Sequence, residues 1–162
     1  MTTLPQLWST FFSAELGAAA GLTGLLFVAI SINLSRILQF PHLPARAAES
    51  LLDLLSVGLV ATFALIPGQG ARACGIEICA TGLLLWVLHT VSLVRLRKFD
   101  RQYVSFASRF TLNQLPPIPF VIAGALLIAG RPSGLYWTVP GILLSFAAGI
   151  FGSWVLLVEI QR

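Results

Sequence analysis

Apolar residues run along this chain in five long stretches, separated by short segments rich in Pro, Gly and charged residues. Each stretch is long enough to cross a bilayer as a helix, since about 20 residues at ~1.5 Å rise per residue cover a ~30 Å hydrocarbon core. Pro67 and Gly68 close the second stretch a few residues before the third, which predicts an antiparallel helical hairpin. The predicted spans are about 15–37, 47–66, 73–95, 111–130 and 135–159.

The fourth stretch differs from the others because prolines interrupt its start. Pro residues lack a backbone donor, so the regular helix is expected to begin near Pro117 and to rise only about 21 Å by Gly130. The preceding segment, about 95–110, is basic and repeats aromatic residues at intervals of three and four. These aromatic residues are Phe99, Tyr103, Phe106 and Phe110. Their spacing predicts an amphipathic helix that lies in the membrane surface before the fourth span.

The composition supports a membrane fold. Hydrophobic residues make up 57% and charged residues 10% of the 162 positions, whereas ordinary soluble domains are roughly 25% charged. A soluble fold of this size cannot bury so much apolar surface, so the excess is expected to contact lipid. The chain is therefore predicted to be an all-α integral membrane protein that forms one domain over 1–162.

Lys and Arg are distributed unevenly between the two sides of the predicted bundle. Eight of the ten lie in the first connection, the third connection and the carboxyl-terminal tail. Because cytoplasmic loops carry the excess of Lys and Arg, the amino end is expected outside and the carboxyl end in the cytoplasm. This distribution also accounts for the net charge of +4 without a nucleic-acid partner.

The first span carries small residues on one side. Gly17, Gly21 and Gly24 form a strip without side chains, where the backbone of another helix can approach closely. A bundle of 162 residues is also too small to enclose a transport path comfortably. Both observations predict that the protein assembles into a homo-oligomer in the lipid bilayer.

The other side of the first span carries a stripe with polar ends and an apolar middle. The stripe includes Glu15, Leu22, Leu26 and Asn33. Such a stripe is typical of a pore with a hydrophobic constriction, and Glu77 near the same outer end could join Glu15 in an acidic ring that attracts cations. Two plainer interpretations stay open. The carboxylates could reach headgroups or pair with Arg72, and the first span could simply be the buried centre of the bundle.

Asp53 and His89 are the ionisable residues that lie deepest within the predicted spans. Each lies roughly two turns inside the cytoplasmic end of its helix, so the hairpin can bring the two side chains to one level. A carboxylate beside an imidazole could be a proton relay or a gate, because His titrates near neutral pH. It could equally be a structural hydrogen bond between two helices.

No catalytic or metal-binding motif is recognised in the sequence, which contains no nucleotide-binding glycine loop, nucleophile elbow or HExxH segment. Cys74 and Cys79 are too far apart on one helix to form a disulfide, and neither matches a zinc-type spacing with a histidine. The chain is thus not expected to be an enzyme, and no cofactor or metal is expected.

Three segments in the first 70 residues resemble a family of small bacterial multi-pass membrane proteins of uncharacterised function. They are Gly21–Leu34 (GLTGLLFVAISINL), Leu43–Glu49 (LPARAAE) and Ile66–Gln69 (IPGQ). The resemblance implies a location in the bacterial inner membrane and transfers no functional residue.

These observations favour a homo-oligomeric ion channel or pore that conducts an inorganic ion. Two alternatives remain: a non-conducting adaptor that regulates another membrane protein, and a small proton-coupled transporter that uses Asp53 and His89.

Overall fold

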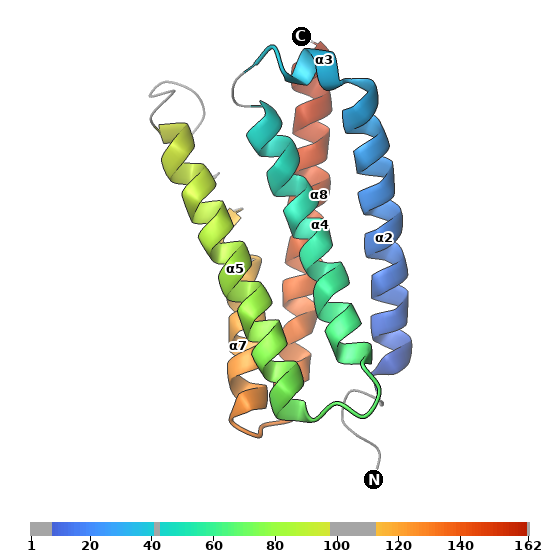
Figure 1. Ribbon diagram of the computed structural model, residues 1–162, viewed down its shortest axis with the longest axis vertical. Helices are drawn as coiled ribbons and strands as arrows, with labels where there is room; N and C mark the ends of the chain where they lie inside the picture. The colour runs from blue at the N-terminus through green and yellow to red at the C-terminus, as the bar shows by residue number, and fades with distance from the viewer. Residues whose placement is uncertain (1–7, 41–42, 98–112, 162) are drawn as a thin grey trace.

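The computed structural model describes residues 8–40, 43–97 and 113–161, and the regular structure in these ranges is helical (Figure 1). The helices are α2 (Ser9–Ile32), α3 (Leu34–Ile37), α4 (Leu43–Leu65), α5 (Ala71–Arg97), α7 (Pro117–Ile128) and α8 (Gly134–Gln161). Four of them, α2, α4, α5 and α8, are long and apolar enough to cross a membrane, and α7 is a shorter apolar helix. The predicted all-α membrane fold is confirmed, with four such helices plus α7.

The helix boundaries differ most from the prediction in the first span, which was expected at 15–37. The helix α2 begins at Ser9 because the aromatic residues around it are packed: Phe12 is fully buried, and the ring of Trp8 lies 4.8 Å from that of Tyr136 on α8. At the other end α2 stops at Ile32. There the side-chain amide of Asn33 donates to the Ala29 carbonyl (2.9 Å), and α3 follows.

The helix α7 begins at Pro117, as the prolines predict, and its 12 residues rise only about 18 Å. Proline suits the first helical position because its missing donor would have no partner there. The amphipathic surface helix predicted for 95–110 lies largely outside the described residues.

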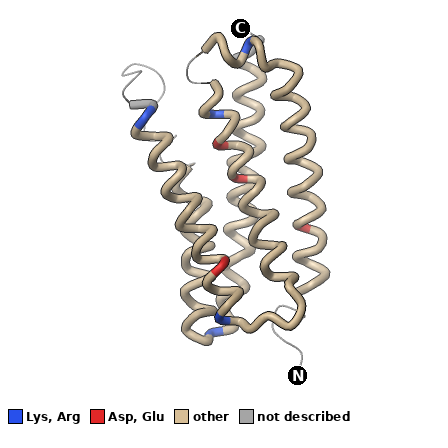
Figure 2. The backbone as a smooth tube through the Cα atoms, in the orientation of Figure 1, with Lys and Arg blue, Asp and Glu red and all other residues tan. Residues whose placement is uncertain are grey.

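The helices are arranged so that α4 and α8 hold the bundle together (Figure 1). The helix α2 lies at one edge against α4, and α5 lies at the other edge against α7. The predicted hairpin of α4 and α5 is antiparallel, but the two helices diverge towards the end where α5 finishes. Figure 2 shows that the Lys and Arg positions of the described residues lie at the two ends of the bundle, whereas the few Asp and Glu positions lie further along the helices.

Close packing around α7 depends on glycines of α5, α7 and α8. A methyl group added at Gly124 would lie 2.5 Å from both the Cβ of Cys79 and the carbonyl oxygen of Gly75. A methyl group at Gly141 of α8 would lie 2.6 Å from the ring of Phe120. Helix backbones that approach this closely gain dispersion contacts, which drive helix association in lipid.

The glycines of α2 are not part of this packing. An added Cβ at Gly17, Gly21 or Gly24 would have no neighbouring atom within 4 Å among the residues that the structure describes. The face of α2 that packs against the bundle is instead the one with Ala19 and Leu26. The helix α2 therefore lies at the edge of the bundle and not at its centre, and assembly through its glycine strip stays a prediction.

The contrast between Gly124 and Gly21 can be tested with the same substitution. Gly124→Ala is expected to lower the free energy of unfolding by about 2 kcal/mol, because the methyl group forces two backbones apart. Gly21→Ala meets open space and is expected to be neutral or slightly stabilising. Unfolding of the detergent-solubilised protein, followed by circular dichroism, measures both changes. Equal effects of the two variants would contradict the assignment of the packing glycines.

Candidate functional site

Asp53 and His89 face each other between α4 and α5. The Nε2 atom of His89 lies 3.5 Å from the Oδ1 atom of Asp53, and both side chains are almost completely buried. Asp53 lies nearly three turns inside α4, about 15 Å from its start. The two residues that the sequence predicts to share a level are thus brought together, at a depth where an ionised group is costly.

The other ring nitrogen of His89 is held by the backbone before α7. The Nδ1 atom of His89 lies 2.6 Å from the carbonyl oxygen of Asn113. In a continuous helix this carbonyl would accept from the backbone N–H of residue 117, but residue 117 is a proline and has none. His89 therefore supplies the donor that Pro117 removes.

This contact decides which nitrogen of His89 carries a proton. A backbone carbonyl only accepts hydrogen bonds, so Nδ1 must be the donor. The Nε2 atom then faces the Asp53 carboxyl group with a lone pair if the ring is neutral. Two acceptors 3.5 Å apart repel, whereas one proton on either group makes the contact attractive. The geometry suits a pair that holds one proton in common.

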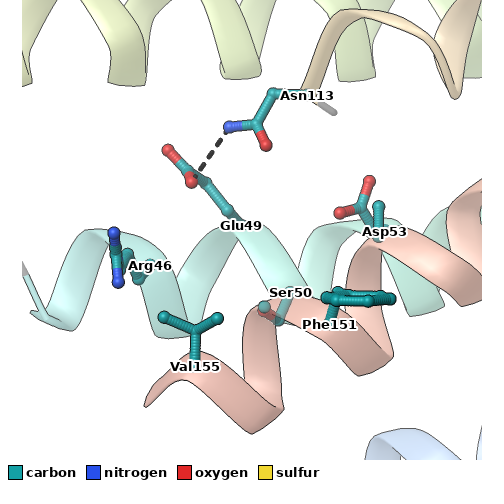
Figure 3. Close-up of a pocket in the computed structure, with 9 residues that line it drawn as sticks. Arg46, Glu49, Ser50, Asp53, Asn113, Phe151 and Val155 are labelled. Atoms are coloured by element: carbon teal, nitrogen blue, oxygen red, sulfur yellow. Dashed lines mark hydrogen bonds between the residues drawn. The ribbon is translucent and has the colours of Figure 1, made fainter. Parts of the chain in front are cut away.

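Glu49 lies one turn before Asp53 on the same face of α4 and links three segments. One carboxylate oxygen accepts a hydrogen bond from the hydroxyl of Ser92 on α5. The other accepts from the side-chain amide of Asn113 at 3.0 Å (Figure 3). Asn113 thus contacts both His89 and Glu49, through its backbone and its side chain respectively. Glu49 and His89 together hold the segment before α7 against α4 and α5.

A pocket of about 110 Å³ lies beside this network. Its polar side comes from α4 and from Asn113, and its apolar side comes from α8 (Figure 3). The lining residues on α4 are Arg46, Glu49, Ser50 and Asp53, and those on α8 are Ala148, Phe151, Gly152 and Val155. A water molecule takes up about 30 Å³ of liquid, so the pocket has room for roughly three or four waters or one small solute.

The stripe on α2 lies elsewhere. Leu26 is buried and Leu22 is half-buried on the side of α2 that packs against α4. The side-chain amide of Asn33 donates a hydrogen bond to the Ala29 carbonyl at the end of α2. None of the residues that line the pocket comes from α2. A path along this stripe would therefore have to open between α2 and α4 or involve another copy of the chain.

Glu15 and Glu77, the two residues of the predicted acidic ring, lie on different sides of the bundle. Glu15 is on α2 at one edge and Glu77 is on α5 at the other edge (Figure 1). One carboxylate oxygen of Glu77 accepts a hydrogen bond from the side-chain amide of Gln69 at 2.6 Å, in the turn before α5. A single chain does not bring the two carboxylates together.

Sequence reasoning missed three members of the site. Ser92 lies three residues after His89 and so shares its face of α5, which is a signal that helical spacing could have supplied. Asn113 is followed by the proline run, and its carbonyl is left without a helical donor for that reason. The hydrogen bonds of Glu49 to Ser92 and Asn113 depend on helix packing that the sequence does not specify.

Comparison with known proteins identifies no relative: no family model matches the sequence, and no curated protein or solved structure is significantly similar. The resemblance to small bacterial membrane proteins therefore stays a prediction. The fold and the site define the class of protein at a coarser level, as an all-α membrane protein with a buried polar site between its helices.

The role of His89 as a substitute donor predicts coupling with Pro117. His89→Leu removes the donor to the Asn113 carbonyl and is expected to lower the free energy of unfolding by about 1–3 kcal/mol. In a Pro117→Ala background the new N–H of residue 117 can serve that carbonyl, so the loss should be about 1 kcal/mol smaller. Unfolding in mixed detergent micelles measures the four proteins of the cycle.

Ile118→Ala provides the matched background, because Ile118 is an exposed neighbour whose backbone N–H is already present. In that background the loss caused by His89→Leu should be unchanged. An equal loss in all three backgrounds would show that the Asn113 carbonyl does not depend on His89.

Proposed function

We propose that this protein moves protons across the membrane, with Asp53 and His89 as the site that holds the proton in transit. The observation that carries the proposal is the geometry of His89. Its Nδ1 atom is committed to the Asn113 carbonyl, and its Nε2 atom faces Asp53 Oδ1 at 3.5 Å. Intramembrane ionisable residues that face each other inside a bundle mark proton relays, and a coupled pair of this kind exchanges its proton as a unit.

The groups around the pair also support a proton site. Besides Asp53, the ionisable groups that line the adjacent pocket are Glu49 and Arg46, on the same face of α4. The segment before α7 contributes the uncharged Asn113, and the lining residues of α8 carry no ionisable group. Asp53 Oδ1 and His89 Nε2 have no other hydrogen-bond partner among the described residues, which leaves them available to share a proton.

Buried hydroxyl groups continue the polar route towards the end of the bundle where α2 begins. Ser56 lies one turn beyond Asp53 on α4, and its hydroxyl is 3.4 Å from that of Ser145 on α8. Thr138 lies two turns closer to the start of α8 and is fully buried, with its hydroxyl donating to the Leu135 carbonyl at 2.6 Å. Hydroxyl groups can both donate and accept, so with intervening water they can pass a proton onward.

A proton-coupled transporter is one of the alternatives that the sequence leaves open, and we now favour proton movement over an ion pore along α2. The pore has less support because Leu26 of the stripe is buried, on the face of α2 where Ala19 joins the core of the same chain. An adaptor function has no specific contact in its favour among the described residues.

Proton uptake into liposomes tests the proposal. The purified protein is reconstituted with a pH-sensitive dye inside, and a pH gradient is imposed with a potassium diffusion potential to balance charge. Asp53→Asn has nearly the same shape but cannot release a proton, so the rate of acidification is expected to fall roughly tenfold or more. Circular dichroism and the elution volume in detergent check that the variant is folded.

Glu15→Gln separates the proposal from a pore along α2. Glu15 lies outside the pocket and the Asp53–His89 pair, so its variant is expected to retain a rate within about twofold of wild type, whereas an acidic entrance on α2 would lose conductance. No uptake by the wild-type protein, or equal uptake by wild type and Asp53→Asn, would overturn the proposal.

A further inference from the structure

The pocket beside the proton site combines a carboxyl group that lacks a donor with an apolar wall. Asp53 lines the pocket from α4, is 2% exposed, and its Oδ1 atom has no hydrogen-bond partner among the described residues. The wall on α8 consists of Ala148, Phe151, Gly152 and Val155. A buried acceptor without a partner is costly, so Asp53 gains free energy from a donor that enters the pocket.

Glu49, the other carboxyl group of the lining, already has its donors. Its two oxygens accept hydrogen bonds from Ser92 and from Asn113. The neutral ring of His89 gives no donor to Asp53 either, because its one N–H is directed to the Asn113 carbonyl. Of the two carboxyl groups in the lining, Asp53 is therefore the one that a ligand with donors would bind.

The charges around Asp53 favour a donor that is positively charged. Glu49 lies about 6 Å from Asp53 along α4, whereas Arg46 lies about 10 Å away and has an interaction of its own. His89 faces Asp53 from α5, Asn113 is uncharged, and the lining residues of α8 carry no ionisable group. The nearest fixed charge is thus negative. A cation with N–H groups gains a charge-assisted hydrogen bond at Asp53, whereas an anion would be repelled.

The volume and the apolar wall restrict this cation to a small one. A pocket of about 110 Å³ holds roughly three or four non-hydrogen atoms, at the ~30 Å³ that one water takes up in the liquid. Figure 3 shows the ring of Phe151 edge-on with one face turned towards Asp53, an arrangement that suits a cation. A metal ion would donate no hydrogen bond. The described residues also contain no group of three His, Cys, Asp or Glu side chains that could hold a metal ion.

We propose that this pocket binds a small primary ammonium ion, such as ammonium or methylammonium, through hydrogen bonds to the Asp53 carboxylate and contact with the apolar wall of α8. The inference rests on the proposed function, because the ammonium ion and the transported proton compete for the same carboxyl group. Binding of the ammonium ion therefore displaces the proton from Asp53.

Thermal unfolding of the purified full-length protein, with methylammonium chloride as the probe, tests the inference. Methylammonium is expected to raise Tm by several degrees in a concentration-dependent manner. Potassium chloride supplies the same charge without an N–H donor, and methanol supplies a donor without a charge. Each control is expected to bind at least roughly tenfold more weakly. Binding of methylammonium should also become weaker as the pH falls, because the proton competes for Asp53.

Three variants locate the binding site. Asp53→Asn has nearly the same shape but no charge and should abolish the shift caused by methylammonium. Phe151→Leu keeps an apolar wall without the ring and should weaken binding about threefold; Phe151 is 61% exposed, so the variant is expected to fold. Glu15→Gln is the matched control, since Glu15 lies on α2 outside the pocket lining, and it should keep the shift.

An absent shift would show that water alone fills the pocket and would overturn the inference. Equal shifts with methylammonium, potassium and methanol would overturn it as well. Proton uptake by liposomes is measured separately, without methylammonium. Uptake without methylammonium binding would remove the ammonium site and leave the proton function in place. Binding without uptake would remove the proton function and keep the ammonium site.

Discussion

A backbone carbonyl without a helical partner needs another hydrogen-bond donor, and the Asn113 carbonyl has no helical donor because residue 117 is a proline. His89 supplies the replacement from α5. Several features of the site follow from this one hydrogen bond. It fixes the proton on Nδ1, aims Nε2 at Asp53, and holds the Asn113 amide where it can donate to Glu49. A proline that shortens a helix thereby creates the arrangement on which the polar site depends.

The two ends of the bundle are held together by different interactions. Near the start of α5 and the end of α7, helices approach closely through Gly75 and Gly124, and dispersion between backbones supplies the attraction. Towards the other end α5 leans away from α4, and hydrogen bonds from Ser92 and Asn113 to Glu49 bridge the segments (Figure 1). Apolar close packing excludes water and solutes, whereas the polar end leaves a pocket. The candidate chemistry therefore lies at the polar end.

The burial of Asp53 and His89 gives the proposed function its physical basis. Burying an ionised group inside a membrane domain costs free energy. Asp53 and His89 lie 3.5 Å apart, so a shared proton can offset part of this cost. A purely structural hydrogen bond would also explain their retention. The orientation of His89 favours a proton site, because the Asn113 carbonyl leaves Nε2 free to exchange a proton with the carboxyl group while the ring stays in place.

Length, apolar composition and the missing proline donor are local properties. They therefore predict the membrane class, most of each long helix and the start of α7 at Pro117. The sequence also predicted that Asp53 and His89 share a level, since a short turn fixes the register of a hairpin. Which glycines pack depends on how the helices are arranged in space. The strip at Gly17, Gly21 and Gly24 has the expected spacing, but none of the described helices lies against it. The contacts of Glu49 and Asn113 were likewise decided by packing, because they join residues 64 positions apart, and helical periodicity describes only the face of one helix and not its partner.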